Sequence, residues 1–154
     1  MIKEGIKAPD FLLPSTEGKE ISLKQYKGKK IVLYFYPKDD TPGCTQEACD
    51  FRDSSKSFDK KDAVVLGVSP DPVAKHEKFR GKYKLPFTLL SDESKEMLKK
   101  YGVWKEKSMY GRKYMGVERT TVVIDQDGKI RRIFPKVKVT DHYKEVLEAL
   151  EDMA

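Results

Sequence analysis

The sequence predicts an α/β fold in which a central mixed β-sheet is flanked by helices. Short apolar runs rich in β-branched and aromatic residues are typical of strands, and helical patterns separate the first of them. The dipeptide Asp127-Gly128 is a tight-turn signal that joins the last two strands as a hairpin. Strands that alternate with helices and then close with a hairpin and a helix predict one sheet covered on both faces.

The predicted strands follow one another along the chain at residues 31–36, 63–69, 88–90, 120–125 and 129–134. A further hairpin is expected around Glu17-Gly18, which adds an N-terminal hairpin extension ahead of the first strand of the sheet.

The predicted helices cover residues 42–59, 72–83, 92–101 and 140–152. Asp71-Pro72 supplies an N-cap followed by proline at the first helical position, and Asp92 and Thr140 are the expected N-caps of the last two helices. Between Val103 and Glu118 the sequence is rich in Trp, Tyr and Met but shows no regular period, which predicts a long aromatic loop.

Length and charge exclude several classes of protein. The 154 residues are expected to fold as one domain, residues 1–154. The net charge of +6 is spread along the chain and forms no basic block, so nucleic-acid binding is not expected. The chain has neither a membrane-spanning apolar stretch nor a signal-peptide pattern, so we expect no membrane contact and a cytoplasmic location.

The chain has two cysteines, and the first lies at a junction between a strand and a helix. Pro37, Thr41 and Cys44 fall at Pro-x3-Thr-x2-Cys spacing directly after the first apolar run. If Thr41 caps the helix and Pro42 takes its first position, Cys44 lies in the first turn. The positive end of the helix dipole favours a thiolate there, although an inert buried thiol is the common alternative for an intracellular cysteine.

A thiolate at Cys44 needs a cation, because Asp39 and Asp40 lie just upstream and disfavour a further negative charge. Lys38 is the nearest basic residue in the sequence. Arg119 is the better candidate, since it begins a predicted strand and can reach the same end of the sheet.

Cys49 lies five residues after Cys44. On one continuous helix their Cα atoms would be about 8 to 9 Å apart, whereas a disulfide needs about 4.4 to 6.8 Å. Pairing therefore requires the start of the helix to unwind. The alternative is that Cys49 is only a small apolar residue near Ala48 and Phe51.

Four segments resemble the Q-type peroxiredoxins, also called bacterioferritin comigratory proteins: FYPKDDTPGCTQEACDFRD, GIKAPDFLLPSTEGKEISL, LPFTLLSD and ERTTVVIDQDGKI. The resemblance implies a thioredoxin-like fold and a thiol-dependent reduction of hydrogen peroxide and alkyl hydroperoxides, with no cofactor and no metal. It implies that Cys44 is the peroxidatic thiolate and Cys49 the resolving cysteine of an intramolecular disulfide, which thioredoxin or a similar dithiol recycles. The family includes monomers and weak homodimers.

The resemblance also implies roles for residues around Cys44. Pro37 would shield the pocket from water, Thr41 would hydrogen-bond the peroxide, and Arg119 would hold the thiolate and polarise the O–O bond. Gly43 would offer a backbone N–H to the substrate, and Glu47 would orient Arg119.

Three other classes fit the sequence less well. A thioredoxin-like disulfide exchanger uses Cys-x2-Cys spacing, which this chain lacks. A metal-binding module would have to combine Cys44, Cys49, His76 and His142, which are widely scattered, with His76 expected on an exposed helix face. A basic DNA-associated protein remains as the third class, whereas no phosphate-binding glycine motif is present.

Overall fold

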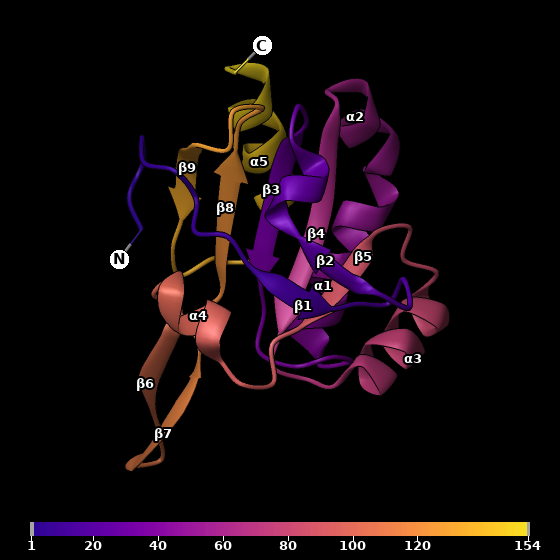
Figure 1. Ribbon diagram of the computed structural model, residues 1–154. Coiled ribbons are helices and arrows are strands. Elements are labelled where there is room, and N and C mark those ends of the chain that lie inside the picture. The colour runs from indigo at the N-terminus through magenta and orange to yellow at the C-terminus, as the bar shows by residue number, and fades with distance from the viewer. Residues whose placement is uncertain (1, 154) are drawn as a thin grey trace.

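The computed structural model describes residues 2–153. Its centre is a five-stranded sheet in the order β5-β4-β3-β8-β9 (Figure 1). The strands are β3 (Lys30–Phe35), β4 (Ala63–Ser69), β5 (Thr88–Ser91), β8 (Thr120–Ile124) and β9 (Ile130–Phe134). β3 is parallel to β4 and antiparallel to β8, so the predicted mixed sheet is confirmed.

Both faces of the sheet are covered, and β3 is buried along its whole length. Its side chains alternate between two cores: Ile31, Leu33 and Phe35 face one, and Val32 and Tyr34 face the other. The second core includes side chains of α1 (Pro42–Asp53), α2 (Ser55–Lys60), α3 (Val73–Tyr83) and α5 (His142–Glu151).

The first core is covered by the N-terminal segment and by α4 (Glu96–Lys100). The predicted N-terminal hairpin is present as β1 (Leu12–Pro14) paired with β2 (Glu20–Ser22), followed by the 3-10 helix η1 (Leu23–Tyr26). Figure 1 shows this hairpin and α4 on one side of the sheet, with α1, α2 and α5 on the other.

Two of the predicted helices differ from the structure, one because it is interrupted and one because it is shorter. Residues 42–59 form two helices, because the chain leaves helical geometry at Ser54. Serine and aspartate side chains compete for backbone hydrogen bonds, and Asp53, Ser54 and Ser55 stand together at this break. The helix predicted at 92–101 is confined to Glu96–Lys100.

The predicted caps were also wrong in detail. Pro72 itself is the N-cap of α3, and the carboxylate of Asp71 instead accepts the backbone N–H of Asp39 at 2.7 Å. Asp92 accepts the N–H of Leu98 from outside α4, and Asp141 occupies the position before α5 that was predicted for Thr140. The carboxylates of Asp71 and Asp92 thus bind backbone groups that the tertiary fold brings close, whereas that of Asp141 pairs with Lys144 at 3.5 Å.

The segment predicted as an irregular loop is a β-ribbon. β6 (Trp104–Met109) pairs with β7 (Arg112–Val117) in antiparallel register, and Tyr110 and Gly111 form the turn with positive φ angles. Most of its residues are exposed on both faces, so its sequence carries no alternation of buried and exposed positions. The period that identifies a half-buried strand is therefore missing.

The topology brings the ends of two strands together. Because β3 and β8 are antiparallel and Phe35 pairs with Thr120, the residues after β3 lie beside the residues before β8. Cys44 follows β3 through a short loop, and Arg119 directly precedes β8.

Within residues 2–153 there is no helix of the length and apolarity that crossing a membrane requires.

Candidate active site

The first turn of α1 begins as the sequence predicted. Thr41 is the N-cap in an extended conformation, Pro42 is the first helical residue, and the carbonyl of Thr41 accepts the N–H of Thr45 at 2.8 Å. The Thr41 hydroxyl does not cap the helix, since it donates to the carbonyl of Lys38 at 2.9 Å. Because the hydroxyl proton of Thr41 is donated within the loop, the hydroxyl oxygen can act only as a hydrogen-bond acceptor toward a ligand.

Cys44 lies in this first turn with 1% of its surface exposed. Its Sγ accepts a hydrogen bond from Nη2 of Arg119 at 3.2 Å, so the predicted cation is in place. Gly43 permits this contact, because a Cβ at that position would lie 3.3 Å from the same nitrogen. A positive guanidinium and the start of a helix therefore act together on one sulfur.

Glu47 holds the other side of the guanidinium. Its Oε1 accepts from Nη1 of Arg119 at 2.7 Å, and the carboxyl group is almost fully buried. Burial raises the pKa of Glu47 to about 7, against the opposing effect of Arg119. Its second oxygen, Oε2, is buried and has no hydrogen-bond partner among residues 2–153.

Arg119 remains protonated at this depth. Burial lowers its pKa, but the charges of Glu47 and Cys44 outweigh that effect and raise the pKa overall. Lys107, on β6, is a second cation near the site, and burial together with the charge of Arg119 lowers its pKa. A guanidinium is the better fixed charge here, because it does not lose its proton.

The two upstream aspartates that oppose a thiolate are both compensated. Asp39 Oδ2 lies 2.6 Å from Nδ1 of His76, and Asp39 Oδ1 accepts the hydroxyl of Tyr36 at 2.6 Å. Asp40 lies at the surface and pairs with Lys82 and with the hydroxyl of Tyr83, each at 2.7 Å. Asp39 thus has two buried partners inside the protein, and Asp40 is paired at its surface.

Comparison with known proteins shows the family to which the chain belongs. A model of the AhpC/TSA family matches residues 5–133 of the chain. The chain belongs to this family. Peroxiredoxin Bcp of Bacillus subtilis is 53% identical over 153 residues, covering 99% of this chain and 98% of the relative. A putative peroxiredoxin bcp of Coxiella burnetii is 54% identical over 149 residues, covering 97% of this chain and 99% of the relative.

Solved structures agree in fold. The bacterioferritin comigratory protein of Xanthomonas campestris, described for its alkyl peroxide reduction activity, superposes with a TM-score of 0.91 at 37% identity, covering 98% of this chain and 99% of that one. A PrxQ variant of Xylella fastidiosa gives 0.94 at 34% identity, covering 99% and 98%. The chain is therefore a Q-type peroxiredoxin with a thioredoxin-like fold, and its activity class is that of a thiol peroxidase.

The second cysteine of this peroxiredoxin points away from the first. Cys49 is half-buried on the same helix and lines a shallow hollow of about 300 Å³ together with Pro42, Thr45 and Tyr83. Burial is the main cause that raises the pKa of its thiol. Cys44 faces Arg119 in the interior while Cys49 faces this outer hollow, and α1 is continuous across both.

Tyr34 is a buried neighbour of the site that the sequence did not identify. Burial, Glu47 and Cys44 together raise its pKa well above the ordinary value, and its hydroxyl has no hydrogen-bond partner within the described chain. Gly67 makes room for the ring, because a Cβ there would lie 2.9 Å from it. The run IVLYFY is apolar on both faces, so nothing in the pattern separates this tyrosine from the core.

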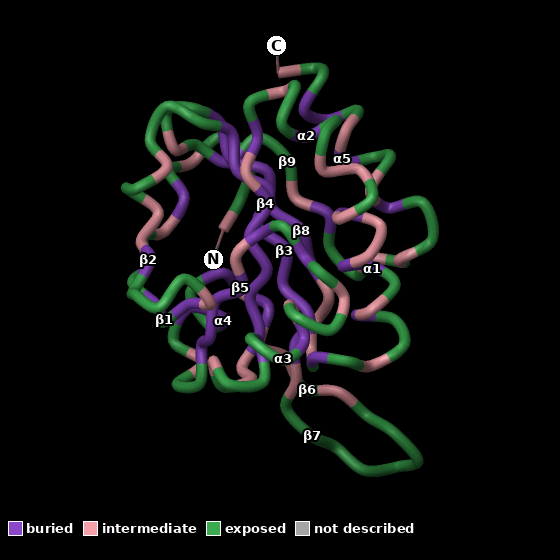
Figure 2. The backbone as a smooth tube through the Cα atoms, turned by 90° about the vertical axis from the view of Figure 1, so that its right-hand side faces the viewer, coloured by how far each residue is buried: buried purple, intermediate pink, exposed green. Residues whose placement is uncertain are grey.

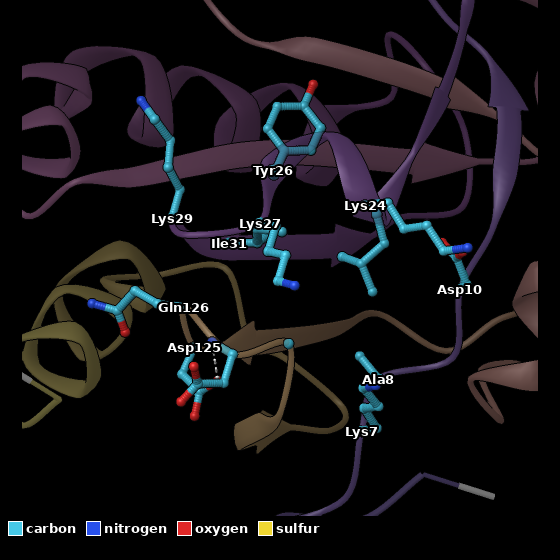
Figure 3. A pocket seen from close by; sticks show the side chains of 13 residues that line it. Lys7, Ala8, Asp10, Lys24, Tyr26, Lys27, Lys29, Ile31, Asp125 and Gln126 are labelled. Carbon is cyan, nitrogen blue, oxygen red and sulfur yellow. Dashed lines mark hydrogen bonds and ion pairs between the residues drawn. The ribbon is translucent and has the colours of Figure 1, made fainter.

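A larger cavity of about 570 Å³ lies elsewhere (Figure 3). It opens at the beginning of β3, around Ile31, whereas Cys44 follows the other end of that strand. Apolar side chains such as Ala8 and Leu23 line it beneath lysines and aspartates, with neither cysteine nor histidine in its wall. The cavity therefore has no nucleophile for peroxidase chemistry.

The two histidines occupy structural positions in this peroxiredoxin. His76 is fully buried, which corrects the prediction that it lies on an exposed helix face. His142 is also buried and bonds to Thr121 and Glu145. Among residues 2–153 no three His, Cys, Asp or Glu side chains are arranged to hold a metal.

Proposed function

We propose that Cys44 is the peroxidatic cysteine of a peroxidase that reduces hydrogen peroxide and alkyl hydroperoxides. The observation that carries this proposal is the Sγ of Cys44 lying 3.2 Å from Nη2 of Arg119 in the first turn of α1. The thiolate attacks one peroxide oxygen, the O–O bond breaks, and the alcohol or water leaves with a proton. The sulfur is thereby oxidised to a sulfenic acid.

The surrounding residues support the transition state of this displacement. Arg119 stabilises the sulfur anion and the negative charge that develops on the departing oxygen. The Thr41 hydroxyl, whose own proton goes to Lys38, accepts a hydrogen bond from the O–H of the hydroperoxide. Pro37, half-buried at the end of β3, limits access of water, and the N–H of Gly43 is available to the substrate. Glu47 fixes the orientation of Arg119.

Resolution uses the second cysteine. The thiolate of Cys49 attacks the sulfenic sulfur of Cys44, the S–S bond forms as the S–O bond breaks, and the departing hydroxide takes up a proton from solvent and leaves as water. An external dithiol of the thioredoxin type then reduces the disulfide and is itself oxidised. We propose that the protein works in the reducing cytoplasm as a monomer or weak homodimer. Cell fractionation and sedimentation velocity test these two statements, and a periplasmic protein or a tight oligomer would contradict them.

The experiment is peroxide turnover in the presence of dithiothreitol or thioredoxin for the wild type, Cys44→Ser and Cys49→Ser. We expect no turnover for Cys44→Ser. Cys49→Ser should give one turnover, or depend on outside thiols that reach Cys44 directly. Turnover that survives the loss of Cys44 excludes the proposed assignment, and a Cys49→Ser variant with full thioredoxin-dependent activity excludes the proposed resolving step.

A further inference from the structure

The β6–β7 ribbon exposes an unusual amount of apolar surface. Of the five large hydrophobic side chains exposed within residues 2–153, four belong to it: Met109, Tyr110, Tyr114 and Met115. Tyr110 at the tip is 98% exposed. Figure 2 shows the ribbon projecting away from the buried core, with its outer half exposed. A two-stranded ribbon of this kind has little stability alone, so exposed apolar residues on it indicate an interaction site.

The base of the ribbon adjoins the candidate active site. β7 ends at Val117, two residues before Arg119, and Lys107 on β6 is close enough for Arg119 and Cys44 to affect its pKa. A macromolecule that binds the ribbon is therefore brought next to Cys44.

The ribbon is also basic. It carries Lys105, Lys107, Arg112 and Lys113 against a single acidic residue, Glu106. Lys105 is partly compensated by Glu118 at 3.7 Å, whereas Arg112 and Lys113 near the tip have no ion pair within the described residues. The surface therefore favours an acidic partner.

We infer that the outer part of the ribbon, residues 109–115, docks the dithiol protein that reduces the Cys44–Cys49 disulfide, through an acidic surface around that protein's reactive cysteines. This inference rests on the proposed function, because it presupposes that a dithiol protein reduces the Cys44–Cys49 disulfide. Tyr, Met and Arg are the side chains enriched at the centre of protein interfaces. All three types lie within residues 109–115.

Two other occupants fit less well. A second copy of this chain would bring one basic ribbon against a chain of net charge +6, which is electrostatically unfavourable. A membrane would need one continuous apolar face. The strand register instead places Met115 opposite Glu106, Tyr114 opposite Lys107 and Met109 opposite Arg112, so every exposed apolar residue of the two strands has a charged neighbour. A surface on which apolar and charged side chains alternate is better suited to contact with a protein than to insertion into a bilayer.

The test compares two ribbon variants with a matched control. Arg112→Glu/Lys113→Glu reverses the charge, and Met109→Ser/Tyr110→Asn removes the apolar tip while keeping a residue that tolerates positive φ. The control reverses two exposed lysines on α2, Lys56→Glu/Lys60→Glu, at the opposite end of the molecule from the ribbon (Figure 1). Turnover of hydrogen peroxide is measured with dithiothreitol, and separately with thioredoxin, thioredoxin reductase and NADPH at varied thioredoxin concentration.

We expect both ribbon variants to keep the wild-type rate with dithiothreitol, which also shows that they fold. Their KM for thioredoxin should rise at least about tenfold, which corresponds to about 1.4 kcal/mol. The α2 control should retain the wild-type KM, and added salt should raise the wild-type KM more than that of the charge-reversed variant.

An unchanged KM in both ribbon variants would overturn the docking inference and leave the proposed function intact. Wild-type turnover with dithiothreitol but none with thioredoxin would also overturn it, because thioredoxin would then not be the reductant. Ribbon-dependent binding to phosphatidylglycerol vesicles, or a ribbon-dependent dimer in sedimentation, with the thioredoxin KM unchanged, would assign the surface to lipid or to a second copy. Loss of turnover with dithiothreitol in the wild type would instead overturn the proposed function, and this inference with it.

Discussion

Asp39 and His76, which are 37 residues apart in the sequence, are in direct contact in the interior of the protein. Nε2 of His76 lies 2.9 Å from the carbonyl of Leu90, which only accepts, so that nitrogen carries a proton. Nδ1 lies 2.6 Å from Oδ2 of Asp39, within hydrogen-bond distance. The pair thus anchors the loop before Cys44 to α3.

Replacement of His76 tests this anchor. In His76→Leu the carboxyl group of Asp39 loses the partner of its Oδ2 and keeps only the hydroxyl of Tyr36 as a buried partner, and we expect the free energy of unfolding to fall by about 3 to 5 kcal/mol. In His76→Leu/Asp39→Asn the remaining group is neutral, so the double variant should recover part of that loss, with a coupling of about 0.5 to 3 kcal/mol. Urea unfolding measures both quantities.

Asp40→Asn is the control, because it breaks an exposed pair in the same loop and should leave the unfolding midpoint nearly unchanged. If the losses of unfolding free energy caused by the substitutions at positions 39 and 76 simply added, the predicted coupling would be refuted.

Arg119→Met removes the charge next to Cys44 while keeping most of the side-chain volume. Loss of one donor aimed at a developing anion typically costs about 10²- to 10³-fold in rate, and we expect a loss of that size in peroxide consumption with dithiothreitol. Arg119→Lys should be intermediate, because an ammonium cannot reproduce the two-sided contact with Cys44 and Glu47.

Arg132→Met is the matched control for this loss. Arg132 stacks on Phe134 at the surface and contacts neither cysteine, so its replacement should leave the peroxide rate unchanged. Comparable rates for Arg119→Met and the wild type would show that the guanidinium has no part in the reaction.

Glu47 makes stability depend on pH. Burial raises its pKa from 4.5 to about 7, so the folded protein keeps a proton that the unfolded chain has already lost between these values. The stabilising contribution of the protonated form is complete below about pH 4.5 and is lost as the pH rises to about 7. The wild type should therefore lose about 3 kcal/mol relative to Glu47→Gln over this range.

Urea unfolding of both proteins at about pH 5 and about pH 8 measures that difference. Glu148→Gln, on the exposed face of α5, gives the baseline for removing a carboxylate at the surface. A constant difference between the wild type and Glu47→Gln at the two pH values would contradict a raised pKa.

Local patterns were sufficient to predict the sheet, because each of its strands is a short run rich in β-branched or aromatic residues. The start of α1 was predictable for the same reason, since Thr41, Pro42 and Cys44 define it within a few residues. Arg119 was a candidate for the same sheet end because it begins a predicted strand, and the antiparallel pairing of β3 with β8, which the sequence did not predict, is what brings it there.

Features that depend on tertiary contacts were not predictable. His76 was placed at the surface because an isolated histidine in a charged helix resembles a solvated residue, and its partner lies in a distant loop. The ribbon from Trp104 to Val117 lacks an alternating pattern because the body of the protein covers only its base. Asp71 and Asp92 are plausible caps in sequence, yet each binds a backbone group outside the predicted position.

Oxidation should unwind the first half of α1. On the continuous helix observed here, five residues separate the Cα atoms of Cys44 and Cys49 by about 8 to 9 Å, beyond the roughly 4.4 to 6.8 Å that a disulfide spans. The loop before Thr41 is held to α3 through Asp39 and His76, so the movement should be confined to residues after that anchor. We expect the amides of residues 42–50 to exchange with solvent at least about tenfold faster in the oxidised protein.

Hydrogen exchange followed by mass spectrometry measures this change in the reduced and peroxide-treated protein. The amides of α5 (His142–Glu151) are the internal control, because that helix carries no cysteine. Peroxide-treated Cys49→Ser should keep the protection of the reduced form, since it cannot form the internal disulfide. Equal protection of residues 42–50 in the reduced and disulfide-bonded wild type would mean that the two sulfurs form their bond without unwinding of α1, and would contradict this prediction.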